Sequence, residues 1–252
     1  MKINGRSGIG CYLYAIADAS DEISCNVPGV NGETVYRIGL GSIVALVSDI
    51  AEKRIRPERK NLVAHHAVAK RLMEQSTVLP MAFGTIASSP EAVLDILKKN
   101  NETFTEQLDR VRGKVEMGLR VVWDTPNIFE YYVNKHPDLA DLRDSVMGKH
   151  RGPSQDDKIE LGRLFDRLLA QDRELHAETV TQILENCCGD IIENDPREER
   201  EVMHLACLVD RNDAKKFEDS VFKAANLFDN SYSFDFNGPW APHHFVNIAL
   251  EV

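Results

Sequence analysis

The sequence predicts a two-domain α+β protein. With 252 residues, of which 43% are hydrophobic, the chain can bury one large core or two of ordinary size, because domains contain about 100 to 150 residues. Short apolar strands and amphipathic helices alternate along both halves of the sequence, which is typical of mixed α+β architectures. A loop around Gly113 separates the two series of elements, so we expect a domain boundary there.

Three strands are expected at the start of the first half. Residues 11–17, "CYLYAIA", are rich in aromatic and apolar side chains and precede a polar loop. Two shorter strands at 35–38 and 43–47 are joined by a glycine-containing turn, which is the pattern of a β-hairpin.

Two helical regions follow in the first half. The first, at 58–76, has one apolar stripe, formed by Leu62, His66, Ala69 and Met73, in which His66 is expected as a core histidine. The second has Ser89 as N-cap and Pro90 as its first residue, with a break near Asn100. With one strand between these helices, the first half resembles a ferredoxin-like unit whose first crossover helix is replaced by a loop.

That intervening strand lies in a run of 16 residues, 75–90, without any charge, although 28% of the chain is charged. The run is too short and too rich in proline and glycine to span a bilayer, which takes about 20 apolar residues. If "VLPMAFGTI" is extended, Leu79, Met81 and Phe83 point to one side. Pro80 has no N–H to donate, so the strand should lie at a sheet edge. It is either a short core strand or a surface for a partner chain.

The second half shows the order strand, helix, strand, strand, helix, strand. The expected strands are 114–124, 190–192, 201–210 and 232–240. A long helical region at 126–186, interrupted at 148–153, has an apolar side made of Leu161, Leu164, Phe165, Leu168, Leu175 and Ile183. The helix at 213–228 is expected to be anchored by Phe217, Val221 and Leu227.

This βαββαβ order is that of a ferredoxin-like domain. We therefore expect an N-terminal α+β domain at 1–112, a C-terminal ferredoxin-like domain at 113–238, and an aromatic and proline-containing tail at 239–252.

Composition argues against several classes of function. The formal charge of −10 does not suit binding to nucleic acid, which needs clustered lysine and arginine. The N-terminus lacks the long apolar core of an export signal, and no segment is expected to enter a membrane, so we expect a cytoplasmic protein. The five cysteines have no CxxC or CxxH spacing, and we expect reduced, unligated thiols.

No catalytic constellation stands out. The segment "IGLGSIVA" has valine at the third glycine position of a dinucleotide-binding loop, and no GxSxG nucleophile elbow occurs. The neighbouring histidines 65 and 66 diverge by about 100° on a helix and do not have the spacing of zinc ligands. A second pair, His243 and His244, lies in the tail. We expect no enzyme activity, no cofactor and no metal.

The tail reads "GPWAPHHFVNIALEV", in which Pro239 and Pro242 fix an extended path on either side of Trp240. Trp240 and Phe245 can pack as a lid on the protein's own core. They can also anchor a second chain, because tryptophan is common in binding hot spots.

These segments together carry a resemblance: "CYLYAIA", "VLPMAFGTI" and "GPWAPHHFV", in this order, make the chain similar to the gas vesicle protein GvpF/GvpL family. The most specific shared positions are Leu79, Pro80, Phe83, Gly84, Thr85, Gly238, Pro239, Trp240, Pro242 and Phe245. The chain departs from the family pattern at Ala82, where a basic residue is common, and at Ala241, His243 and His244.

The resemblance implies a non-enzymatic protein of the cytoplasm and the gas vesicle, needed for assembly of the vesicle shell or retained in it as a minor structural component. Its implied partners are the hydrophobic shell protein and other gas vesicle accessory proteins. Such a shell protein exposes apolar and β-edge surface that also promotes aggregation, and a soluble partner could cover it until the shell nucleates. We expect the binding surface to comprise Leu79, Pro80, Met81, Phe83, Gly84, Pro239, Trp240, Pro242 and Phe245. The alternative is a ferredoxin-like enzyme or small-ligand-binding regulator with a cleft between the domains.

Overall fold

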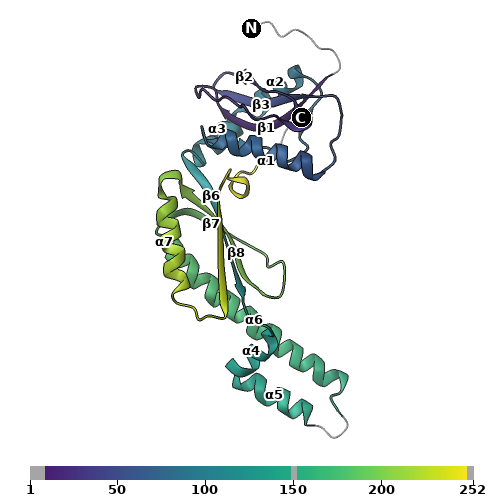
Figure 1. Cartoon of the computed structure of the whole chain (residues 1–252), viewed down its shortest axis with the longest axis vertical. Helices are drawn as coiled ribbons and strands as arrows, with labels where there is room; N and C mark the ends of the chain where they lie inside the picture. Colours follow the sequence, from purple (N-terminus) through teal and green to yellow (C-terminus); the bar gives the residue numbers. More distant parts are fainter. Residues whose placement is uncertain (1–8, 149–151, 249–252) are drawn as a thin grey trace. The chain divides into compact units, whose positions relative to one another are not determined.

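The computed structural model describes residues 9–148 and 152–248 of the chain. It has a mixed α+β fold with two sheets, and the chain divides into two compact units (Figure 1). The first unit comprises Met1–Glu116 together with Gly238–Val252, and the second comprises Met117–Asn237. The C-terminal segment therefore belongs to the same unit as the N-terminal half of the chain.

The sheet of the first unit has the strand order β2-β3-β1-β4, and β5 pairs with β1 beside β4. Its strands are β1 (Gly10–Asp18), β2 (Val35–Leu40), β3 (Ile43–Ile50), β4 (Val78–Pro80) and β5 (Ile86–Ala87), and β1 pairs antiparallel with β3, β4 and β5, as β2 does with β3. Seven consecutive residues of β1 are buried. Because side chains alternate across a sheet, both faces of β1 must be covered.

In the first unit, α1 (Arg59–Met73), α2 (Pro90–Lys99) and α3 (Asn101–Arg110) pack against this sheet (Figure 1). The unit also contains the short helices η1 (Val30–Gly32) and η3 (His243–Phe245). The expected start of α2 is confirmed, because the Ser89 hydroxyl accepts a hydrogen bond from the Ala92 N–H at 3.2 Å and Pro90 follows as the first helical residue. The expected break also occurs at Asn100.

The buried face of α1 differs from the expected stripe. It consists of Asn61, His65, Val68, Ala69, Leu72 and Met73, so the core histidine is His65, whereas His66 is exposed. Two polar residues, Asn61 and His65, lie on this buried face. A search for an apolar stripe passes over such positions, and it therefore placed the buried face one residue away.

The second unit contains a four-stranded sheet in the order β7-β8-β6-β9. The strands are β6 (Lys114–Trp123), β7 (Cys188–Asn194), β8 (Glu201–Asp210) and β9 (Tyr232–Trp240). Its helices are α4 (Ile128–Lys135), α5 (Pro137–Met147), α6 (Gln155–Leu184), η2 (Arg211–Asp213) and α7 (Ala214–Ala225). Figure 1 shows α7 and the later half of α6 alongside this sheet, and α4 and α5 next to the earlier half of α6.

Three expectations for the helices of the second unit are corrected. The helical region divides a second time at His136, because Pro137 begins a new helix. The buried side of α6 consists of Leu161, Phe165, Leu169, Ala177, Val180 and Leu184, whereas Leu175 is 59% exposed. Leu227 lies beyond α7 and is 64% exposed, so it does not anchor that helix.

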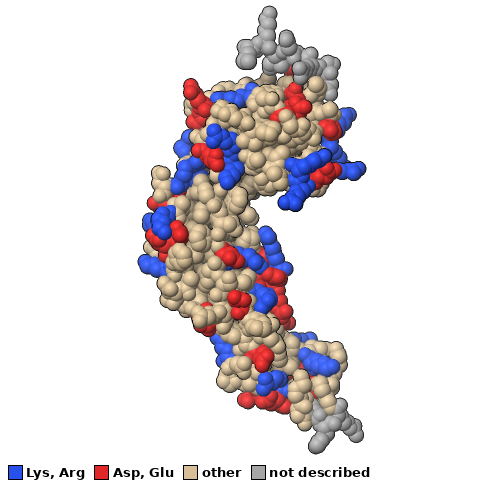
Figure 2. All heavy atoms as spheres, viewed as in Figure 1, with Lys and Arg blue, Asp and Glu red and all other residues tan. Residues whose placement is uncertain are grey.

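The surface of each unit mixes acidic and basic side chains on the face drawn in Figure 2. No described helix combines the length and the apolar composition that a membrane span requires.

Candidate partner-binding pocket in the first unit

The two segments singled out in the sequence line one pocket of the first unit, with a volume of about 640 Å³. We call it the Phe83–Trp240 pocket. The uncharged run, the C-terminal segment, α1 and the start of β6 all contribute to its lining, which is His65, His66, Ala69, Lys70, Met73, Met81, Ala82, Phe83, Glu116, Pro239, Trp240, Ala241, His243 and His244.

The uncharged run forms one edge of the sheet, as the proline in it predicted. In the described sheet, β4 ends the strand order and pairs with β1 alone. Beyond Pro80 the chain continues along β1: the Met81 N–H donates to the Tyr14 carbonyl, and the Leu13 N–H donates to the Thr85 carbonyl, each at 2.9 Å. The intervening residues bulge away from the strand and carry Phe83 into the wall of the pocket.

Several of the expected anchors are buried within the unit itself. The side chains of Leu79, Met81 and Phe245 are at most 3% exposed, and Pro80 and Pro242 are buried as well. Met81 lines the pocket, but a partner could not reach Leu79, Pro80, Pro242 or Phe245 without rearrangement of the core. The accessible members of the expected surface are Phe83, Gly84, Pro239 and Trp240.

The two aromatic residues at the opening differ in exposure. Phe83 is half-buried and its ring meets those of Tyr12 and His65 edge to face, with centroids 6.2 and 5.7 Å apart. Trp240 is 45% exposed, and the expected packing of this residue as a closed lid is therefore only partial. An aromatic side chain with this exposure has apolar surface left for a partner.

The polar base of the pocket is His65. Its Nδ1 lies 3.0 Å from the Tyr12 hydroxyl, and burial, followed by the charges of His66 and His243, lowers the pKa of His65 to about 4. Burial also raises the pKa of Tyr12 to about 12. Both groups are consequently neutral near pH 7, and the tautomer of His65 decides which of them donates the hydrogen bond.

The pocket offers little for acid–base chemistry. Glu116 is the one carboxylate in its described lining, and both of its oxygens accept hydrogen bonds from His244. Among the described residues, no cluster of three or more histidine, cysteine, aspartate or glutamate side chains could hold a metal ion. The arrangement is suited to receiving an apolar group, with Lys70 and the exposed histidines at its margin.

Comparison with known proteins identifies relatives over almost the whole chain. Residues 10–247 match the profile of a family described as gas vesicle synthesis protein GvpL/GvpF. Gas vesicle protein F of Nostoc sp. is 24% identical over 243 residues, covering 95% of this chain and 99% of the relative. Gas vesicle protein L of a Streptomyces species is 26% identical over 264 residues, covering 95% of this chain and 94% of the relative.

A solved structure also resembles the chain. The crystal structure of the gas vesicle protein GvpF from Anabaena sp. PCC7120 superposes with a TM-score of 0.78 at 23% identity, covering 96% of this chain and 97% of that one. At this identity the likeness demonstrates a shared fold.

Proposed function

Because the chain belongs to the GvpL/GvpF family of gas vesicle synthesis proteins and thus has a gas vesicle-related role, we propose that it takes part in building the vesicle shell without catalysing a reaction. In this proposal it binds the hydrophobic shell subunit through the Phe83–Trp240 pocket. The protein then either leaves once the shell has formed or stays in it as a minor component.

One observation carries the proposal. The two segments most specific to the family lie far apart in the sequence, yet they meet in the first unit and form a single pocket whose opening has two accessible aromatic residues, Phe83 and Trp240. A core alone would not require an exposed tryptophan at this point. Accessible aromatic residues around an apolar depression are a common feature of protein-binding sites.

The chemistry of the pocket suits a shell subunit. A protein that lines a gas-filled space needs an apolar surface, and before assembly this surface would aggregate in water. An apolar side chain of the subunit can enter between Phe83 and Trp240, where Met73 and Met81 form an adaptable lining. The short edge strand β4 lies beside the pocket, so an extended segment of the subunit has a backbone surface nearby.

The test is capture of purified shell subunit by the full chain and by single variants. We expect Phe83→Ala and Trp240→Ala to weaken capture by about tenfold or more, because each removes about 1.5–3 kcal/mol of apolar burial. Phe222→Ala is the matched control, since Phe222 is an aromatic residue of the second unit with 56% exposure. Circular dichroism checks that each variant is folded. If both pocket variants capture the subunit as well as the parent does, the pocket is not the binding site.

A separate measurement distinguishes a permanent component from a transient assembly factor. Buoyant vesicles are floated, washed, and analysed by mass spectrometry for the ratio of this protein to shell subunit. A fixed low ratio that survives washing indicates a component of the shell. Complete loss to the cytosol, together with failure of vesicle formation when the protein is deleted, indicates an assembly factor that is released.

We also infer that both units are variants of the ferredoxin-like arrangement. In each unit, numbering the four main strands along the chain gives the sheet order 4-1-3-2, which the split βαβ topology requires. In the first unit the segment between β1 and β2 contains only the short η1 in place of a crossover α-helix.

A further inference from the structure

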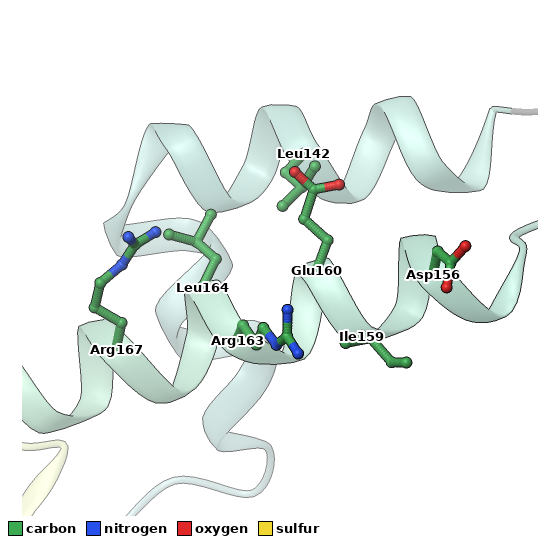
Figure 3. Close-up of a pocket in the computed structure, with 7 residues that line it drawn as sticks. All are labelled: Leu142, Asp156, Ile159, Glu160, Arg163, Leu164 and Arg167. Carbon is green, nitrogen blue, oxygen red and sulfur yellow. The ribbon is translucent and has the colours of Figure 1, made fainter.

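The second unit has a groove between α5 and α6, with a volume of about 660 Å³ (Figure 3). Leu142 of α5 forms one side. The remaining lining comes from α6 at spacings of three and four residues, which places these side chains on one face of the helix; they are Asp156, Ile159, Glu160, Arg163, Leu164 and Arg167. None of them was singled out in the sequence as part of a functional site.

Charge is segregated along this face. The two acids, Asp156 and Glu160, precede the two bases, Arg163 and Arg167, so each pair of neighbours four residues apart carries like charge. Like-charge pairs at this spacing destabilise an isolated helix by about 0.2–0.5 kcal/mol each. Within the described parts of the chain, none of these four side chains has a hydrogen-bond or ion-pair partner. In a single copy of the chain, the like charges at each end of the face repel each other, and only Glu160 and Arg163, three residues apart at its middle, are oppositely charged neighbours on the face.

A second copy of the same helix, running antiparallel, matches this face residue by residue. Reversal about the midpoint between Leu161 and Gly162 places Asp156 opposite Arg167 and Glu160 opposite Arg163. The same operation places Ile159, which is 41% exposed, opposite the half-buried Leu164. All three pairings follow from one two-fold axis, and in a two-fold symmetric interface each pairing occurs twice.

We propose that two copies of this chain associate through the α6 faces in this antiparallel register. The four ion pairs that form around the axis place an opposite charge beside each of the like-charged neighbours, which remain on their own helices. This inference is independent of the pocket in the first unit and of the binding of a shell subunit.

The association should be weak and sensitive to salt. The face covers 12 residues, or about 18 Å of helix, whereas each partner in a stable interface contributes about 20–30 residues. Exposed ion pairs contribute about 0.2–1 kcal/mol each and are screened at high ionic strength. The dimer should therefore appear at high protein concentration and low salt, and dissociate near 1 M salt, where the Debye length is about 3 Å.

Sedimentation velocity of the full chain tests the register through charge reversal. Glu160→Arg and Arg163→Glu each place like charges at two symmetric contacts, and each should weaken self-association by about tenfold or more. An equimolar mixture of the two variants should associate again, because both contacts then join an arginine of one variant to a glutamate of the other. Glu174→Arg, an exposed position further along α6, is the matched control and should associate as the parent does.

Restored association in the mixture is the decisive result. If the single variants had lost association only because an ion pair within their own helix was broken, mixing them with another molecule would not restore it. The proposal is wrong if the parent stays monomeric at low salt and at concentrations of about 1 mM. It is also wrong if the single reversals associate as the parent does, which would place the contact elsewhere, or if the mixture fails to associate.

Discussion

The carboxylate of Glu116 accepts two hydrogen bonds from His244, one from the backbone N–H at 2.9 Å and one from Nδ1 at 2.7 Å. Glu116 is 6% exposed and lies near the start of β6, whereas His244 belongs to the short C-terminal helix η3. The pair fixes the C-terminal segment in the first unit and thereby positions Trp240 at the pocket. A buried carboxylate requires such partners, because an unpaired one is strongly destabilising.

We expect Glu116→Gln to lower the free energy of unfolding by about 1–3 kcal/mol, since hydrogen bonds to a charged group are replaced by weaker neutral ones. Urea denaturation measures this change. Glu178→Gln is the control, because Glu178 is an exposed residue of α6 and its replacement should shift stability by less than about 0.5 kcal/mol. Equal shifts for both variants would show that the Glu116–His244 pair does not hold the tail.

A second prediction concerns pH and His65. The unfolded chain protonates this histidine near its ordinary pKa of about 6.5, whereas burial lowers the pKa in the folded state to about 4. Below pH 6.5 the unfolded chain therefore binds a proton that the folded chain excludes, and stability declines until the pH reaches about 4. The full loss from this group is roughly 3 kcal/mol.

Urea denaturation as a function of pH tests this assignment. His65→Gln removes the imidazole but retains an acceptor for the Tyr12 hydroxyl, so its stability should change less between pH 6.5 and 4 than that of the parent. His66→Gln, at the exposed neighbouring position, should keep the steeper dependence of the parent. If the two variants show the same pH dependence, His65 is not the source of the slope.

The fold was predictable where local signals were strong. Ser89 and Pro90 marked the start of α2, and apolar runs located β1, β3 and β8. The buried faces of α1 and α6 were less predictable, because polar residues such as Asn61 and His65 occupy core positions through hydrogen bonds that the sequence does not reveal. Leu175 shows the opposite case, an apolar residue left on the surface.

The candidate site was predictable as two segments but not as one pocket. Sequence reasoning selected Phe83 and Trp240, yet it contained no information that these residues would line the same cavity. It also missed Glu116, whose signal is a lone acid between the apolar residues Val115 and Met117 of a strand. Burial of Leu79 and Phe245 depends on the neighbouring strands and helices, and a single segment cannot show it.

Gly84 provides a final prediction about the edge of the sheet. Its φ is +86°, a conformation in which an L side chain is strained, and its N–H donates to the Tyr12 hydroxyl at 3.1 Å. Gly84→Ala should therefore cost about 1–2 kcal/mol in the free energy of unfolding, although a methyl group would meet only Ile55, at 3.9 Å. Since Phe83 precedes this turn, the same variant should also weaken capture of the shell subunit.

Gly39→Ala is the matched control for this strain. Gly39 lies in β2 without a positive φ, and a methyl group there would make ordinary contacts at 3.7 Å or more. Its replacement should be neutral or slightly stabilising, because alanine restricts the unfolded chain. If Gly84→Ala proves as stable as Gly39→Ala, the turn after Phe83 adopts another conformation in solution, and the wall of the pocket is not held by the hydrogen bond to Tyr12.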